Sequence, residues 1–275
     1  MSEASNEFST AHLRHVQRRY YGRWLAATLI LAAFAFVVHA FATGQIAWKV
    51  VGQFFTAKAI LIGLENTIIM TICAMALGIV LGVVFAVMYM SPNPVLKNVA
   101  RFYVWFFRGT PLLLQLLLWF NLALIFPVIG IPGVLEGRTV DLITPFVATL
   151  LGLGINQGAY TAEVVRSGIL SVDKGQTEAA KSIGMTPMTT LRRVVLPQAM
   201  RVIIPPTGNN FINMIKGTSM ASVIAFLELI HAANNISSRN LEIMETLFAA
   251  AAWYLVMVSL ASVGQHYLER AYGPR

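Results

Sequence analysis

The sequence predicts an all-α integral membrane protein with six transmembrane helices. Of its 275 residues, 57% are hydrophobic and only 12% are charged, whereas soluble domains carry about 25% charged residues. Several apolar runs are long enough to cross a hydrocarbon core of about 30 Å as helices. Helices are required there, because backbone groups in lipid must form their hydrogen bonds within the segment. These observations exclude a soluble globular chain.

We place the six spans in apolar runs that are separated by polar or charged segments. They cover about 24–42, 63–90, 111–131, 142–165, 203–229 and 247–263. The first run, which ends in Ala40-Phe41-Ala42, also resembles a cleavable signal, but its length exceeds a normal signal core and favours a retained helix. Between the first two spans, aromatic residues lie near Lys49 and Lys58, which suits a segment at the outer membrane interface.

The distribution of Lys and Arg gives the orientation. If the N-terminus is cytoplasmic, fifteen basic residues fall in inner segments and four in outer segments. The inner residues are Arg14, Arg18, Arg19, Arg23, Lys97, Arg101, Arg108, Arg166, Lys174, Lys181, Arg192, Arg193, Arg201, Arg270 and Arg275, and the outer residues are Lys49, Lys58, Arg138 and Arg239. Because basic residues concentrate on the cytoplasmic side, both termini are predicted to be cytoplasmic. The same rule explains the net charge of +8 without a nucleic-acid partner.

Small residues recur at four-residue spacing in the second and fourth spans. Ala74, Gly78 and Gly82 share one helix face, and Gly154 and Gly158 share another. Such faces allow helices to approach closely in membranes. The pattern therefore predicts a multi-helix bundle.

The polar segment 171–201 is the most informative part of the chain. Residues 173–183 are predicted to form a short helix that Gly184 ends. Thr186 and Pro187 supply a cap and a first residue for a second helix, which Pro197 is expected to break before the fifth span. By shape alone, this helical hairpin either joins two spans or docks a cytoplasmic partner.

The residues of this hairpin resemble the EAA loop of ABC importer permeases. The positions that match its fixed spacing are Glu178, Ala179, Ala180, Gly184, Leu196 and Pro197. Val194 departs from the pattern, which usually has Ile there. The resemblance implies a type I importer (MetI-like) bundle in which this loop is a coupling helix. Those six residues would then contact a groove on a separate ATPase subunit.

Further segments resemble the permeases of polar amino acid importers, which take histidine, arginine, glutamine, glutamate and opines. They are 108–115, 158–163 with Arg166, 175–176, Lys216 with 218–219, and 228–229. The resemblance covers about 63–267. Members commonly have five spans and an external N-terminus, so one additional first span leaves the orientation of the other spans unchanged.

The predicted organisation follows from the spans and the resemblance. Residues 1–23 form a cytoplasmic segment, and 24–60 form an additional first helix with an outer interfacial segment. Residues 61–268 form the permease transmembrane domain with the coupling loop 171–201, and 269–275 form a cytoplasmic tail. The expected location is the bacterial inner membrane.

The resemblance also implies partners. These are an ABC ATPase dimer, a second permease subunit that is identical or different, a soluble substrate-binding protein, and membrane lipid. The sequence contains no Gly-x-x-x-x-Gly-Lys-Ser/Thr phosphate loop and no Cys/His metal spacing. We therefore expect no cofactor, metal or enzymatic activity in this chain, with ATP and Mg²⁺ bound by the ATPase subunits.

Polar residues within spans are candidates for the substrate path, because they are costly in a membrane. They are Gln115, Asn156, Gln157, Glu163, Asn209 and Lys216. Glu163 either pairs with Arg166 one turn away or meets a substrate ammonium group. These amides, together with Asn210 and Asn213, either join helices or bind the substrate. Lys216 contacts either a partner subunit or a substrate carboxylate.

The leading interpretation is a permease subunit of an ATP-driven importer for polar amino acids. The alternative is an ion-coupled secondary transporter or channel, which favours an inverted repeat or a chain of buried carboxylates. No clear repeat is found, and Glu163 and Glu228 qualify only loosely as such carboxylates. A membrane enzyme has no support, because no nucleophile–base or metal motif is found.

Overall fold

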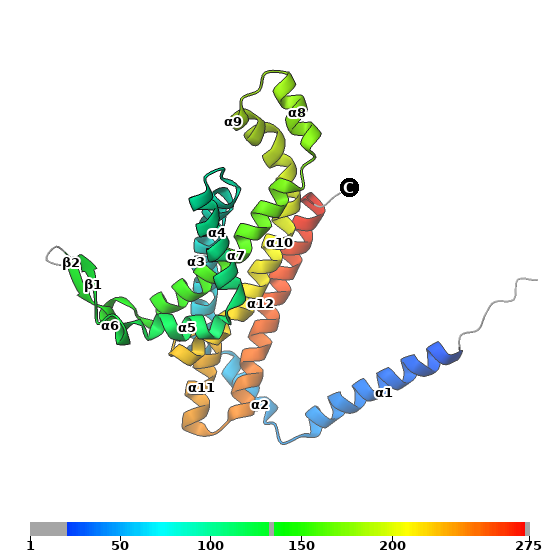
Figure 1. Cartoon of the computed structure of the whole chain (residues 1–275). Coiled ribbons are helices and arrows are strands. Elements are labelled where there is room, and N and C mark those ends of the chain that lie inside the picture. Colours follow the sequence, from blue (N-terminus) through cyan, green and yellow to red (C-terminus); the bar gives the residue numbers. More distant parts are fainter. Residues whose placement is uncertain (1–20, 132–134, 273–275) are drawn as a thin grey trace, which may run out of the picture. The chain divides into compact units, whose positions relative to one another are not determined.

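A computed structural model describes residues 21–131 and 135–272 (Figure 1). The chain divides into two units, Met1–Ile46 and Ala47–Arg275. In the first unit, helix α1 covers Tyr21–Thr43 and buries none of its residues, as expected for a span that is apolar on all sides. The predicted cytoplasmic Arg14, Arg18, Arg19 and Arg275 lie outside the described residues.

Two long helices, α3 (Lys58–Met90) and α7 (Pro145–Leu170), pack closely along each other in the second unit. Their small residues permit the close approach. A Cβ atom added to Gly78 would lie 2.6 Å from Gln157 Cγ, and one added to Gly82 would lie 2.4 Å from Thr161 Cβ. The predicted close packing is confirmed, and the two predicted faces pack against each other.

The predicted third span, 111–131, is wrong in its boundaries. Helices α4 (Pro94–Gly109) and α5 (Leu112–Phe120) form a pair that is bent by 103°. After η1 (Leu122–Leu124), the chain leaves the helix altogether and forms an antiparallel hairpin. Pro111 lies at the bend, where its ring and missing amide prevent one continuous helix.

The sequence analysis missed α4 because this helix is amphipathic. Tyr103 and Val104 are buried, while Lys97 lies half-buried and Arg101 and Arg108 are exposed. The Tyr103 hydroxyl donates a hydrogen bond of 2.6 Å to the Ile155 carbonyl of α7. These three basic residues, predicted to lie in a loop, therefore lie on a helix that packs against α3 and α7.

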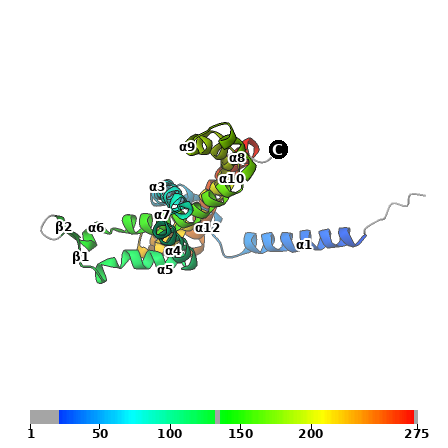
Figure 2. The same ribbon diagram turned by 45° about the horizontal axis from the view of Figure 1, so that its top comes forward.

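A short segment joins α5 to α7. It contains β1 (Val128–Ile131), β2 (Leu135–Arg138) and α6 (Thr139–Leu142). Val128 pairs with Arg138, and Ile131 pairs with Leu135. The hairpin projects away from the helices of this unit in both views (Figures 1 and 2).

The predicted helical hairpin at 171–201 is present, but its end differs from the prediction. Helices α8 (Lys174–Ser182) and α9 (Pro187–Thr190) are followed by a π-helical turn, η2 (Leu191–Val195), and directly by α10 (Leu196–Gly217). Pro197 therefore does not break the helix. The wider π turn changes the backbone just before Pro197, and proline is tolerated in the first turn of a helix.

The fifth predicted span, 203–229, is also not a single helix. After α10 come a 3₁₀ helix, η3 (Thr218–Ile224), and α11 (Leu229–Asn240), with a bend of 45°. Ala225 has a left-handed backbone with φ of 58° at the break. The chain turns there because α11 has its own buried cap.

That cap is the Glu228 carboxylate, which is fully buried. It accepts backbone hydrogen bonds from Ile230 (2.8 Å) and His231 (2.7 Å), and another of 2.9 Å from the Tyr254 hydroxyl. The Leu229 amide donates to Thr67 Oγ1 of α3 at 3.2 Å. These contacts fix the bend to α3 and to the last helix.

The last helix, α12 (Ile243–Tyr272), covers the predicted sixth span. The amphipathic α2 (Trp48–Phe55) packs against it. Phe55 stacks on Trp253 with ring centroids 4.3 Å apart, and Trp253 Nε1 donates to the Phe55 carbonyl at 2.9 Å.

Within the described residues, α1, α3 and α12 are each long and apolar enough to cross a membrane, and the two bent pairs raise this number to five. Helix α7 is not among them, but its 26 residues give a length of about 39 Å. The predicted six spans are compatible with this structure, and their number stays a prediction.

Candidate functional site

The first candidate site is the hairpin of α8 and α9, which lies at the same end of the unit as the C-terminal end of α12 (Figure 1). Asp173 caps α8 by accepting from the Gly175 amide at 2.7 Å. Gly184 has a φ of 79°, a conformation that favours glycine. The Met185 amide then donates to the Ala180 carbonyl at 3.1 Å. These local signals explain why the sequence predicted the hairpin correctly.

Most of the predicted coupling residues are open to contact in this structure. Glu178, Ala179, Gly184 and Pro197 are exposed, Leu196 is half-buried, and Ala180 is buried against the hairpin. The prediction missed two apolar side chains at the tip, Ile183 (78% exposed) and Met188 (71% exposed). The available signal was a large apolar residue directly before Gly184 and another in the first turn of the helix that begins at Pro187.

The second candidate site is a cavity of about 560 Å³ beside the bend between α4 and α5. Helix α4, helix α7 and helix α10 contribute its polar side chains. They are Arg108, Thr110, Asn156, Gln157, Tyr160, Asn210 and Asn213. The Arg108 guanidinium lies over the Tyr160 ring, 5.2 Å from the centroid. The cavity thus combines one cation, amides and a phenol.

Gln115 is adjacent to this cavity but does not line it. It is buried at the bend, and its Nε2 donates to the carbonyls of Phe107 (3.0 Å) and Thr110 (3.1 Å) and to Thr110 Oγ1 (2.8 Å). The end of α4 leaves carbonyls without helical partners. Gln115 therefore stabilises the bend, which is the helix-joining alternative for this residue.

Asn156 and Gln157 reach the cavity while they also hold helices together. Asn156 Nδ2 donates to the Phe107 carbonyl at 2.8 Å and to Gln115 Oε1 at 3.3 Å. Gln157 Nε2 donates to Thr161 Oγ1 at 3.2 Å, and its stem packs on Gly78. Of the six predicted path residues, these two line the cavity.

Glu163, on α7, does not line the cavity. Arg166 donates to both of its carboxylate oxygens, at 3.1 Å from Nε and 2.5 Å from Nη2. Arg166 also lies over the Tyr89 ring at 5.0 Å. The local ion pair accounts for this geometry without a substrate.

Asn209 and Lys216 lie on one exposed face of α10. The face also contains Val202, Pro206 and Asn213, at successive spacings of three or four residues. Asn213 belongs both to this face and to the cavity. We call this set, residues 202, 206, 209, 213 and 216, the polar face of α10.

The structure therefore brings together residues that the sequence analysis only partly selected. Thr110 and Tyr160 were not predicted as path residues, although Tyr160 stands in a motif that carries the resemblance. The helical spacing of 209, 213 and 216 was a signal for one face. Among the described residues, no group of His, Cys, Asp or Glu side chains is arranged to hold a metal ion.

Comparisons with known proteins match this architecture. A family described as the binding-protein-dependent transport system inner membrane component matches residues 78–273. The arginine transport system permease protein ArgU of Corynebacterium glutamicum is 43% identical over 255 residues, covering 92% of this chain and 80% of the relative. The L-cystine transport system permease protein TcyB of Bacillus subtilis is 42% identical over 209 residues, covering 76% and 84%.

Solved structures agree with these relatives. A chain in the crystal structure of an amino acid ABC transporter with histidines is 38% identical, with a TM-score of 0.68 over 78% of this chain and 94% of that chain. The MetNI methionine ABC transporter shares the fold at 19% identity, with a TM-score of 0.63 over 78% and 97%. The predicted type I importer bundle is confirmed.

The family match covers more than two thirds of the chain, and the relatives extend the likeness into its N-terminal part. In this family the membrane subunit is distinct from the ATPase, and transport depends on a substrate-binding protein. The chain therefore belongs to the binding-protein-dependent transport system inner membrane components, the multi-pass permease subunits of ABC importers.

Proposed function

We propose that this permease imports polar amino acids along the polar face of α10 and through the cavity beside Arg108. The observation that carries the proposal is the continuity of these two features through Asn213. The names of the relatives, which concern arginine and L-cystine, support an amino acid as the substrate class.

The polar face of α10 indicates where the path lies. Two amides and the Lys216 ammonium group are exposed on a helix of a membrane bundle. Polar groups at membrane depth do not face lipid, but face a protein partner or a water-filled cavity. A second permease subunit, identical or different, would cover this face and complete the path.

The cavity suits a zwitterion. The Arg108 guanidinium matches an α-carboxylate, because its fork of donors binds carboxylates in a bidentate manner. Asn210 and Asn213 supply carbonyl oxygens that can accept from an α-ammonium group. The Tyr160 ring lies against one face of the guanidinium and leaves the N–H donors at its edge available to a carboxylate.

Coupling would run through the hairpin of α8 and α9. Its exposed apolar tip, Ile183 and Met188, suits insertion into a groove on the ATPase, beside the exposed Glu178 and Ala179. ATP and Mg²⁺ would be bound by the two ATPase subunits. With this hairpin and the end of α12 in the cytoplasm, α2 and α11 face the outside, as the basic residues predict.

The test uses the permease reconstituted in liposomes with its ATPase subunits and binding protein. Arg108→Met should raise the KM for amino acid uptake by about tenfold or more, because hydrogen bonds to a charged group contribute about 1.5–3 kcal/mol. Arg108→Lys should retain part of the affinity. Arg138→Met is the matched control, since Arg138 lies on the exposed hairpin and pairs only at 3.8 Å with Asp141.

An unchanged KM in Arg108→Met would exclude this cavity as the substrate site. Uptake that persists without ATP and stops when the ion gradient is collapsed would instead support the ion-coupled alternative.

A further inference from the structure

The middle of α10 lacks two of its own backbone hydrogen bonds. Pro205 and Pro206 lie inside the helix, and neither has an amide to donate to the carbonyls of Arg201 and Val202 one turn earlier. Thr207 Oγ1 donates to the Ile203 carbonyl at 2.7 Å. The helix is therefore weakest between residues 201 and 207.

The two halves of α10 pack against different parts of the bundle. On the coupling side, Ala199 and Ile203 are buried against Ala86 of α3 and Val165 of α7. On the other side, Phe211 and Ile215 join a cluster with α12 and α11. The prolines thus separate a segment that continues into the coupling hairpin from a segment that carries Asn209, Asn213 and Lys216.

Gln265 of α12 connects directly to this weak point. Gln265 is buried, with an exposed fraction of only 8%. Nε2 donates to the Pro205 carbonyl at 2.8 Å and to Glu269 Oε1 at 2.8 Å. Oε1 has no hydrogen-bond partner and lies against Gly208, where an added Cβ would be only 1.6 Å away. A side chain at position 208 is incompatible with this contact.

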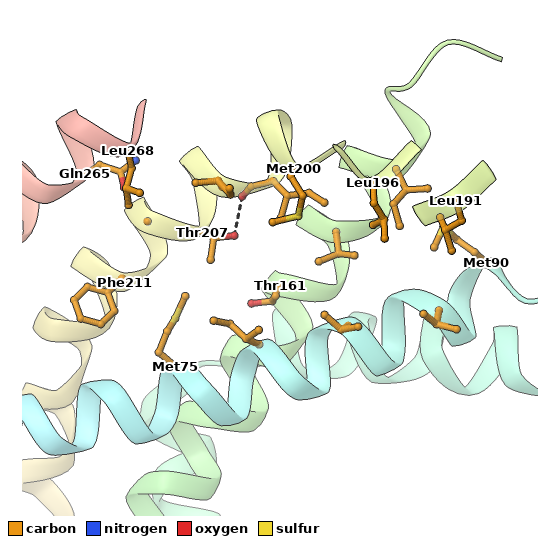
Figure 3. Close-up of a pocket in the computed structure, with 18 of the residues that line it drawn as sticks. Met75, Met90, Thr161, Leu191, Leu196, Met200, Thr207, Phe211, Gln265 and Leu268 are labelled. Atoms are coloured by element: carbon orange, nitrogen blue, oxygen red, sulfur yellow. Dashed lines mark hydrogen bonds between the residues drawn. The ribbon is translucent and has the colours of Figure 1, made fainter. Parts of the chain in front are cut away.

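An apolar cavity of about 1410 Å³ lies beside the same residues (Figure 3). Thr207 and Phe211 line it from α10, Gln265 and Leu268 from α12, and Met75 from α3. Close-packed helices resist displacement because protein interiors have few voids. Here α10 has open space on the side that faces α3.

We propose that residues 205–208 form a hinge in α10 and that Gln265 is the positioning residue that sets its angle from α12. The inference rests on the proposed coupling function. Movement of the hairpin changes the angle between the two halves of α10, and the polar face of α10 follows only if that angle has one defined value in each nucleotide state. The bond from Gln265 to Pro205 maintains that angle where the helix cannot do so itself.

The experiment uses the assembled transporter and measures amino acid uptake per ATP hydrolysed. Gln265→Leu should lower this ratio about threefold, the effect of a typical interhelical hydrogen bond in a membrane on a two-state equilibrium. Gly208→Ala should act in the same direction, because its methyl group displaces Gln265. Adding Gly208→Ala to Gln265→Ala should cost little more. Glu269→Gln is the matched control, since its amide oxygen can still accept from Gln265.

A second readout follows the hinge itself. Cys73, the single cysteine, is replaced by serine, and spin labels are placed at Gln198→Cys and Met220→Cys, which are exposed positions on the two sides of the prolines. In the otherwise unchanged protein, the distance between the labels should differ between the nucleotide-free and ATP-bound complexes. Gln265→Leu should reduce that difference and broaden the distribution, whereas a merely structural role would lower thermal stability alone.

Wild-type uptake ratios and distances in both Gln265→Leu and Gly208→Ala would overturn the hinge. If Gln265→Leu fails to assemble, the double variant Gly208→Ala/Gln265→Ala gives the same comparison. A label distance that does not respond to ATP before any change at Gln265 would also overturn the hinge. Uptake that needs no ATP in the unchanged transporter would overturn the coupling function itself, which separates the two failures.

Discussion

Replacement of Gln115 by methionine distinguishes a structural amide from a substrate-binding one. The Gln115 side chain donates to three acceptors at the bend between α4 and α5 and accepts from Asn156. Methionine has a similar length and volume but makes none of these bonds. At about 0.6 kcal/mol for each polar contact in a membrane protein, the loss is about 2 kcal/mol.

That loss corresponds to a fall in melting temperature of about 4–8 °C for a domain of this size. The assay is thermal unfolding of the purified permease in detergent, followed by the reaction of Cys73 with a fluorescent thiol reagent. Cys73 is half-buried in α3 and is the single cysteine. Gln53→Met is the control, because the same substitution is made at an exposed position of α2.

The KM for uptake should remain unchanged in Gln115→Met, because the side chain does not line the cavity. A melting temperature equal to that of the unmodified permease, together with a raised KM, would refute this reasoning. Gln115 would then bind the substrate, which is the second of the two roles that the sequence allows for this amide.

Two further changes test the coupling tip and the helix packing. Ile183→Asp should abolish co-purification of the ATPase subunits without a change in melting temperature, because the side chain is 78% exposed; retained co-purification would exclude the tip as the docking element. Gly82→Ala should destabilise the permease by about 1–3 kcal/mol, since its Cβ would lie 2.4 Å from Thr161 Cβ. Gly52→Ala, whose Cβ would meet nothing within 4 Å, should not change the melting temperature in the same thiol assay, and equal effects of both changes would contradict the close packing of α3 and α7.

Local signals explain the accurate parts of the sequence analysis. Asp173, Gly184 and Thr186 act on backbone groups within a few residues of themselves, so they define the coupling hairpin without reference to the rest of the chain. The small residues of α3 and α7 could also be recognised from the sequence, because the helical period alone determines which residues share one face of a helix. Composition alone identified the chain as a membrane protein, because a chain this apolar has too few polar residues to cover the surface of a soluble protein.

The errors occurred where the backbone departs from what the local pattern predicts. Hydropathy placed a span at 111–131, but α4 is amphipathic and its Tyr103 and Val104 are buried against α7. Pro197 was expected to end a helix, but the π turn before it allows α10 to continue. In the first place a contact with another helix decides the outcome, and in the second a π turn that the sequence pattern does not predict.

The sequence by itself determined a helical membrane protein with a helical hairpin at 171–201, because apolar length and cap residues act locally, and the resemblance of this hairpin predicted the permease family. Only the tertiary structure decided which polar residues are available to a substrate. Gln115 and Asn209 are both amides in apolar surroundings, yet one is bonded to the carbonyls of a bend and the other lies on an exposed helix face. The difference depends on the positions of α4, α5 and α10, and those positions result from contacts between residues far apart in the chain.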